Sequence, residues 1–200
     1  MRRTAPLPLA AAALLVLTAC TSGPAPDGGD ASPDASTAAD ATGALLARHG
    51  LSGMDGREVV DHLEALDVAD RPDDLVASVR VDGLLLGDGS AEATLPLPDD
   101  VFYLSVAPFV DETHDCFFHS LTTCQGELAG EGVSVSLVDA GSGEVLVDED
   151  VVLGSNGFAG FWLPRDVDAR LTVESGGRTG TATVSTTPDD PTCLTTLRLA

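Results

Sequence analysis

Lysine is absent from the sequence, and all ten basic residues are arginines, against 32 acidic residues. The formal net charge is −22. Such a surface repels nucleic-acid phosphates and anionic lipid headgroups, which argues against a nucleic-acid-binding role. A negative surface attracts cations in general, so the charge is compatible with metal handling without establishing it.

Long apolar runs are also lacking. The run at residues 9–17 is too short to span a bilayer, which takes about 20 residues. It follows Arg2 and Arg3 and ends just before Cys20, the arrangement of an export signal with a lipidated cysteine. Residues 1–19 are therefore predicted to be a lipoprotein signal peptide, after which Cys20 anchors the chain to the cell membrane outside the cytoplasm. An ordinary signal with an incidental cysteine is the alternative.

Branched aliphatic and aromatic side chains are missing from residues 21–42, which contain only Gly, Ala, Ser, Thr, Pro and Asp. Nothing there can offset the entropic cost of ordering the chain. We therefore predict that residues 20–42 are the lipidated cysteine and a flexible tether. Removing the signal takes away two arginines and no acid, so the formal charge goes from −22 to −24.

Helical patterns fill residues 43–81. Asp55 and Glu58 have the spacing of a capping box, and the apolar residues behind them share one helix face. These residues are Val59, Val60, Leu63 and Leu66. Pro72 is typical of a first helical turn. Leu75, Val76 and Val79 would then lie on the inner face of this further helix.

Strand and turn patterns replace the helical ones over residues 82–200. The expected strands cover residues 84–86, 92–97, 102–110, 133–138, 144–148, 157–163, 169–174, 179–185 and 193–199. Short strands at regular spacing favour an antiparallel sandwich or barrel. With only eight aromatic residues in the chain, Phe158, Phe161 and Trp162 are expected in its core. The predicted fold class is α+β, with a short N-terminal helical part followed by an antiparallel β-rich domain.

Cysteine is scarce, with four in the chain. Once Cys20 carries the lipid, three thiols remain, at Cys116, Cys124 and Cys193. Outside the cytoplasm cysteines usually pair, so an odd number leaves at least one thiol that needs another reason. This odd count is the first indication of metal or redox chemistry.

Two of the four cysteines and two of the four histidines fall within residues 114–124. His114 and Cys116 are two positions apart and share a face on an extended segment. His119 and Cys124 reach the same volume if the chain turns between them, and Cys193 could close the site from a distance. Thiolates select Cu(I), and imidazole accepts Cu(II) and zinc as well. The alternative is a plain Cys116–Cys124 disulfide, which would stabilise the fold by about 2–3 kcal/mol.

Five stretches make the chain resemble the CueP family of extracytoplasmic copper-binding proteins. They are FYLSVAP at 102–108, THDCFFHSLTTC at 113–124, GEL at 126–128, GFAGFWLPR at 157–165 and TCLTT at 192–196. The likeness runs from about Leu51 onwards. It implies a helical part joined to a β-rich domain, a homodimer, and copper handling with supply to a secreted superoxide dismutase. It also implies that the three thiols match the family's cysteines, and that His114 and His119 match neighbouring histidines.

The resulting hypothesis is a copper-binding lipoprotein of copper homeostasis rather than an enzyme, in which Cys116, Cys124 and Cys193 hold Cu(I) with His114 or His119 assisting. Two thiols could also reduce Cu(II) stoichiometrically if a thiol-reducing partner restored them. Three alternatives stay open: an envelope β-sandwich module with a structural disulfide, a zinc-binding protein, and a thiol–disulfide exchange protein.

Overall fold

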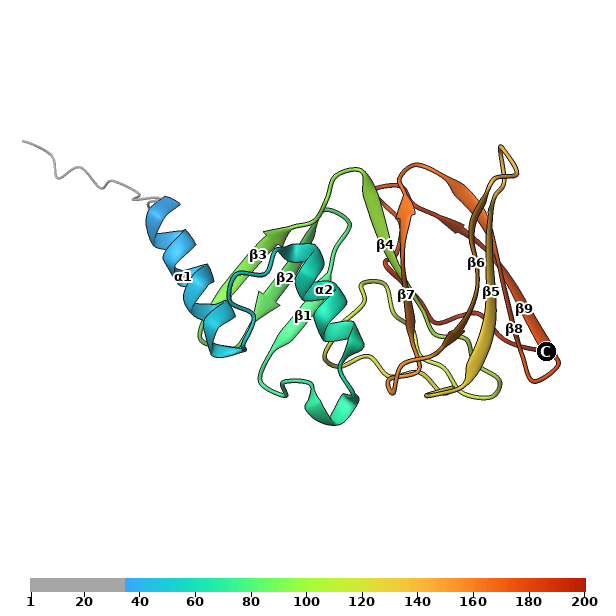
Figure 1. Ribbon diagram of the computed structural model, residues 1–200, viewed down its shortest axis with the longest axis horizontal. Coiled ribbons are helices and arrows are strands. Elements are labelled where there is room, and N and C mark those ends of the chain that lie inside the picture. Colours follow the sequence, from blue (N-terminus) through green and yellow to red (C-terminus); the bar gives the residue numbers. More distant parts are fainter. Residues whose placement is uncertain (1–34) are drawn as a thin grey trace, which may run out of the picture. The chain divides into compact units, whose positions relative to one another are not determined.

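The structure, a computed structural model, describes residues 35–200 (Figure 1). The predicted signal peptide, Cys20 and the first part of the predicted tether lie outside the described residues. Among the helices of the described part, none is long and apolar enough to cross a membrane. The fold consists of helices at the N-terminal side followed by mostly antiparallel sheets, which confirms the predicted α+β class.

Two α-helices and a short 3-10 helix begin the fold: α1 (Ala35–Arg48), α2 (Gly56–Ala65) and η1 (Val68–Asp70). The predicted capping box starts α2. Asp55 accepts a hydrogen bond from the Glu58 amide, and Glu58 accepts one from the Asp55 amide, each at 2.9 Å. The inner face of α2 is buried as expected. Because α1 begins at Ala35, residues 35–42 are helical, in contrast to the predicted tether.

Three antiparallel strands form the first sheet: β1 (Val76–Val79), β2 (Gly83–Gly87) and β3 (Glu92–Pro96). The helix predicted behind Pro72 is wrong, because Val76 and Val79 belong to β1. Their branched side chains suit a pleated strand, and pairing with β2 outweighs a spacing that also fits a helix. Gly89 adopts a φ of 78° in the β2–β3 turn.

The first sheet and both helices share one hydrophobic core. Val59, Val60 and Leu63 of α2 are part of it. Tyr103 and Leu121 extend this core toward the second half of the chain. At the end of α1, Arg48 donates to the Asp88 carboxylate of the β2–β3 turn at 2.6 Å, which ties the helix to the hairpin.

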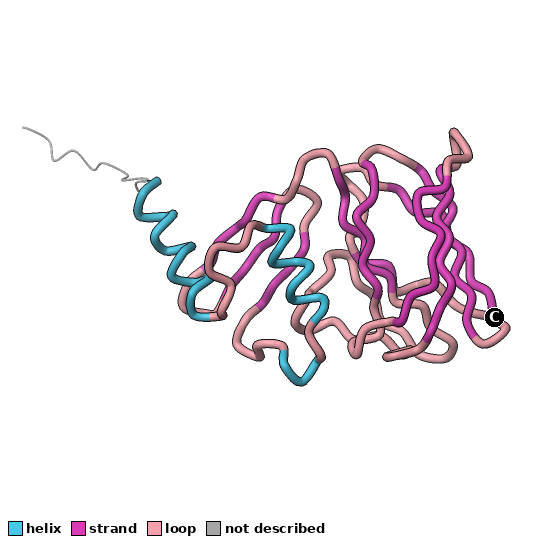
Figure 2. The backbone as a smooth tube through the Cα atoms, viewed as in Figure 1, coloured by secondary structure: helices cyan, strands magenta, loops and turns pink. Residues whose placement is uncertain are grey.

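The second half contains two further sheets (Figure 2). The strands of the smaller sheet are, in order, β10 (Cys193–Leu194), β4 (Val101–Val106) and β7 (Ala159–Pro164). Those of the larger are β6 (Val145–Val152), β5 (Gly132–Asp139), β8 (Asp168–Ser175) and β9 (Arg178–Ser185). Alternate residues of both sheets bury a common core that includes Phe102, Leu137 and Leu171. All pairs are antiparallel except β10 with β4, which is parallel.

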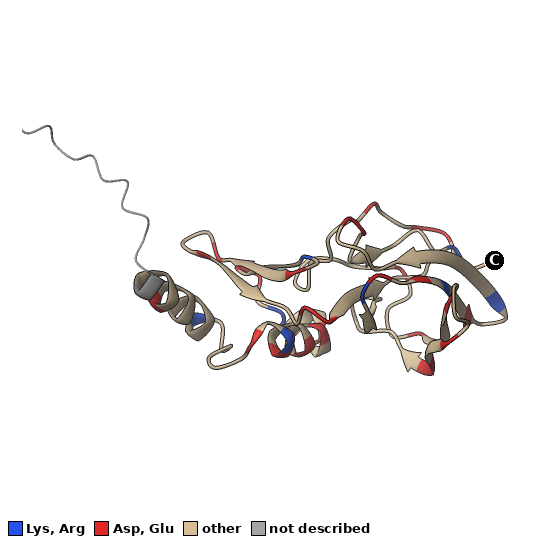
Figure 3. Cartoon of the chain, turned by 90° about the horizontal axis from the view of Figure 1, so that it is seen from above, with Lys and Arg blue, Asp and Glu red and all other residues tan. Residues whose placement is uncertain are grey.

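Acidic residues are spread over the helices, strands and turns, and basic residues are few (Figure 3). The long connection between β4 and β5 carries most of the residues singled out from the sequence, and Cys193 opens β10 beside it.

Candidate metal centre

The connection between β4 and β5 is held by backbone hydrogen bonds from two sides. On one side it lies along β1, where the Val79 amide donates to the His119 carbonyl at 2.8 Å and the Leu121 amide donates to Ala77 at 2.9 Å. On the other side the Cys193 amide donates to the Phe117 carbonyl at 3.2 Å. The segment that carries the cysteines and histidines is therefore fixed between the first sheet and β10.

The three sulfur atoms predicted to converge do lie together. Cys116 and Cys193 form a disulfide, with their Cα atoms 5.6 Å apart. Cys124 is the one cysteine of the described residues outside that bond, and its Sγ lies 3.6 Å from the Cys116 Sγ. The structure thus corrects the disulfide considered from the sequence: Cys116 pairs with Cys193, 77 positions away, and not with Cys124.

Both histidines of the segment approach these sulfurs. His114, Cys116 and Cys124 form one group whose ligand atoms all lie within 4.8 Å of one another. His119, Cys124 and Cys193 form a second such group. His114 is exposed, whereas His119 is completely buried. Cys124 belongs to both groups and is the candidate ligand that the two imidazoles have in common.

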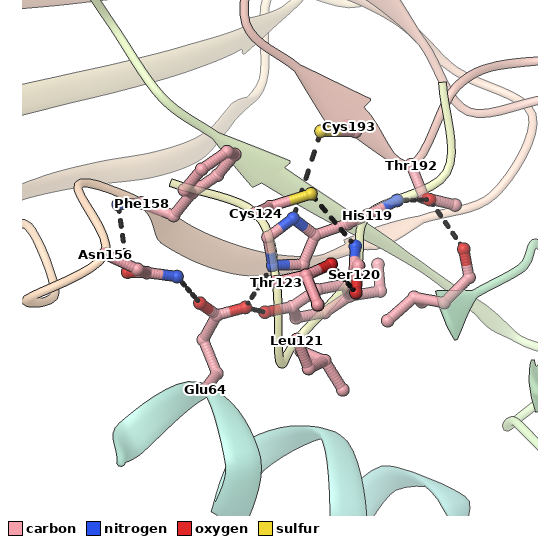
Figure 4. A network of polar contacts seen from close by, with 12 residues as sticks. Glu64, His119, Ser120, Leu121, Thr123, Cys124, Asn156, Phe158, Thr192 and Cys193 are labelled. Carbon is pink, nitrogen blue, oxygen red and sulfur yellow. Dashed lines mark hydrogen bonds and ion pairs between the residues drawn. The ribbon is translucent and has the colours of Figure 1, made fainter. Parts of the chain in front are cut away.

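His119 sits between the sulfurs and a carboxylate (Figure 4). Its Nδ1 lies 3.9 Å from the Cys193 Sγ, and its Nε2 lies 2.9 Å from Oε2 of Glu64 on α2. The ring packs against Phe158, with ring centroids 4.6 Å apart. The backbone amide of His119 donates to Thr192 Oγ1 at 3.0 Å, next to Cys193. The imidazole is therefore contacted at both ring nitrogens and by one aromatic ring.

Sequence reasoning missed Glu64 and the residues around it. Tyr103 donates its hydroxyl hydrogen bond to Glu64 at 2.7 Å, and the Asn156 side-chain amide donates to it at 3.0 Å. The Arg71 guanidinium lies 3.7 Å from the same carboxylate. The signal in the sequence is that Glu64 follows Val60 by four positions, which places an acidic residue on the buried face of α2.

Burial and hydrogen bonding act in opposite directions on the pKa values of three groups in the centre. Burial alone would raise the pKa of Glu64, but hydrogen bonds from His119, Tyr103 and Asn156 lower it to about 2. Burial alone would lower the pKa of His119, yet Cys124 and Glu64 on its two sides raise it. Burial opposes ionisation of Cys124, but hydrogen bonds from His119 and from the Ser120 amide lower the pKa of its thiol. Thiolate is the form in which a cysteine binds metal or attacks a disulfide.

The exposed side of the centre faces a cavity of about 250 Å³ that is lined by His114, Glu112 and Glu127 among others. The Glu127 carboxylate accepts hydrogen bonds from the backbone amides of residues 110–112, the shortest at 2.7 Å. These bonds lower the pKa of Glu127 and fix the chain just before His114. His114 therefore shares this cavity with two carboxylate side chains.

The fold and the thiol–imidazole cluster define a candidate metal-binding protein. Residues 58–198 match the family described as periplasmic copper-binding protein CueP, and the chain belongs to this family, which confirms the resemblance found in the sequence. The crystal structure of S.CueP is similar, with 40% sequence identity and a TM-score of 0.75 over 80% of this chain and 97% of that one. No curated protein matches the sequence.

Proposed function

We propose that the protein binds copper outside the cytoplasm as part of copper homeostasis, and that it holds Cu(I) through three cysteines with one of two histidines assisting. The proposed ligands are Cys116, Cys124, Cys193, His114 and His119. The observation that carries this proposal is that sulfurs from distant parts of the chain meet beside both imidazoles, with ligand atoms within 4.8 Å in each group. The description of the family as copper-binding supports copper as the ion.

The donor set also supports Cu(I) over harder cations, because thiolates prefer soft metal ions. Binding by all three sulfurs requires the Cys116–Cys193 disulfide to be reduced. In the oxidised form, Cys124 and the histidines remain as donors. Zinc accepts the same ligands, so it is the control metal for any affinity measurement.

We also propose that the cysteine pair can reduce Cu(II). Cys116 and Cys193 together would lose two electrons and two protons as their sulfur–sulfur bond forms. Each of two Cu(II) ions would take up one electron and become Cu(I), and Cys124 would be left as a thiolate donor. The reaction is stoichiometric, and a thiol-reducing partner is needed to restore both thiols.

The proposed function also includes the membrane location of the protein and its partners. We propose that Cys20 is lipidated and holds the chain to the membrane surface, and that bound copper passes to a secreted enzyme such as superoxide dismutase. A homodimer is part of the same proposal. Intact-mass measurement of the purified protein tests the anchor, because Cys20→Ala would remove the added lipid mass and release the protein from membranes.

Competition between the reduced protein and a Cu(I) chelator tests the central proposal. Wild type is expected to withdraw Cu(I) from the chelator, and Cys124→Ser and Cys193→Ser are each expected to bind it more weakly. His119→Asn is also expected to bind Cu(I) more weakly, and His62→Asn, on the exposed side of α2, is its matched control. Equal Cu(I) affinity in wild type and both serine variants would refute the three-thiolate site. Parallel zinc titrations show which metal the site prefers.

A structural role for the disulfide is the second candidate, because it joins the β4–β5 connection to β10. If the bond is only a staple, protein isolated without reductant contains the disulfide in every molecule, and its reduction changes stability without creating a Cu(I) site. Thiol counting together with the chelator competition separates the two functions.

A further inference from the structure

Glu64 is an acidic side chain that reaches the candidate metal centre from the helical part of the fold. We propose that Glu64 is a positioning residue: it accepts the Nε2 hydrogen of His119 and thereby presents the unprotonated Nδ1 of His119 to copper at the cysteine sulfurs. This inference rests on the proposed function for its consequence, but the tautomer itself is a property of the metal-free protein.

The hydrogen bonds around Glu64 determine which atom carries the proton. Its carboxylate accepts hydrogen bonds from the Tyr103 hydroxyl at 2.7 Å and from the Asn156 side-chain amide at 3.0 Å. The Arg71 guanidinium lies 3.7 Å away. The Asn156 side chain is held in this orientation, because its Oδ1 accepts a hydrogen bond from the Phe158 backbone amide at 3.2 Å. A carboxyl group among these donors is an ionised acceptor, so the proton of its 2.9 Å contact with His119 belongs to Nε2.

The ring of His119 has no room to turn and exchange its two nitrogens. The residue is completely buried, and Phe158 packs against the ring at 4.6 Å between centroids. The backbone of His119 is hydrogen-bonded as well: its amide donates to Thr192 Oγ1, and its carbonyl accepts from the Val79 amide. Nδ1 consequently remains on the side of the sulfurs, 3.9 Å from the Cys193 Sγ.

A carboxylate behind a ligating histidine fixes the ring and makes the free nitrogen a better donor, and its removal typically lowers metal affinity by 10–100-fold. In this protein the carboxylate comes from α2, whereas the ligands come from the β4–β5 connection and β10. The helical part therefore contributes directly to the centre.

Affinity measurements on reduced, full-length protein test the proposal. Glu64→Gln keeps the shape of the side chain and is expected to weaken Cu(I) binding by about 10–100-fold. The same change in a His119→Asn background is expected to have no further effect, because Glu64 acts through His119. Asp61→Asn is the matched control, since Asp61 lies one turn earlier on α2 and contacts Trp162 instead, at 2.8 Å. Affinity of Glu64→Gln within threefold of wild type would overturn the proposal, as would an equal loss in both backgrounds.

The tautomer is measured separately by the nitrogen-15 NMR shifts and long-range couplings of the His119 ring in wild type, first without metal and then with Cu(I), which is diamagnetic. A proton on Nε2 and none on Nδ1 is expected in both samples, and a bare Nε2 or a protonated Nδ1 would overturn the proposal. If wild type fails to bind Cu(I), the proposed function is refuted, while the metal-free spectrum still decides the role of Glu64.

Discussion

The phenol ring of Tyr103 lies directly against the Cα of Gly160 on the neighbouring strand β7, where any Cβ would collide with the Tyr103 hydroxyl. That hydroxyl donates a hydrogen bond to Glu64, the residue that contacts His119. Because Gly160 has no Cβ, the Tyr103 side chain has room to make this hydrogen bond. A glycine in the middle of a strand is thereby connected to the candidate metal centre.

Gly160→Ala is expected to push Tyr103 away from Glu64. Overpacking of this kind costs about 1–3 kcal/mol of unfolding free energy. Cu(I) affinity should fall as well, because Glu64 loses a hydrogen bond. Denaturant unfolding and chelator competition measure the two effects. Gly132→Ala is the control, because a Cβ at that strand position meets nothing within 4 Å. Equal effects of the two alanines would contradict this account of Gly160.

The Cys116–Cys193 disulfide closes a loop of 77 positions and should stabilise the metal-free protein by about 4 kcal/mol. Cys116→Ser combined with Cys193→Ser should lower the free energy of unfolding by about that amount. In a Cys20→Ala background, thiol titration is expected to find one reactive thiol in the oxidised protein and three after reduction. Three reactive thiols before reduction, or a disulfide-linked peptide that lacks Cys193, would show that the pairing is wrong.

The two histidines should differ in their effect on copper. His119 is buried and held by Glu64 and Phe158, whereas His114 is exposed. A preorganised ligand loses less entropy on binding, so His119→Asn is expected to weaken Cu(I) binding more than His114→Ala. Chelator competition gives both affinities, and thermal unfolding shows whether folding is intact. A larger loss with His114→Ala would place the ion nearer the exposed group.

Acid should loosen α1 before the rest of the fold. Hydrogen bonds from Ser90 and Arg48 hold the pKa of Asp88 well below its usual range. A lowered pKa in the folded state means that this carboxylate stabilises the fold fully above about pH 3.8 and loses its contribution as the pH falls further. The protection factors of the α1 amides against hydrogen exchange should therefore fall below that pH. Asp88→Asn should show the faster exchange already at neutral pH, and unchanged exchange in this variant would refute the link.

Local patterns in the sequence were sufficient for several parts of the fold. The capping box of Asp55 and Glu58 needs only neighbouring residues, and it starts α2 as predicted. The alternation of β5 and β8 likewise follows from burial of one face. β1 was mistaken for a helix because Val76 and Val79 fit both periods, and the pairing with β2 that decides between them is not local.

The candidate centre was only partly predictable for the same reason. His114, Cys116, His119 and Cys124 lie close in the sequence, so their grouping could be seen there. The choice of Cys193 over Cys124 as the partner of Cys116 depends on the parallel pairing of β10 with β4. Glu64 could not be assigned at all, because its contact with His119 spans 55 positions and depends on how α2 packs.

The span of these contacts has a consequence for when metal can be captured. An extended chain offers only a neighbouring pair of thiols, at Cys116 and Cys124, and the complete donor set arises when β10 docks on β4. Metal binding and folding are then coupled equilibria, so Cu(I) bound by the native state raises its resistance to heat and denaturant. An unfolded chain would therefore bind copper weakly, and tight binding would begin only after the domain has folded.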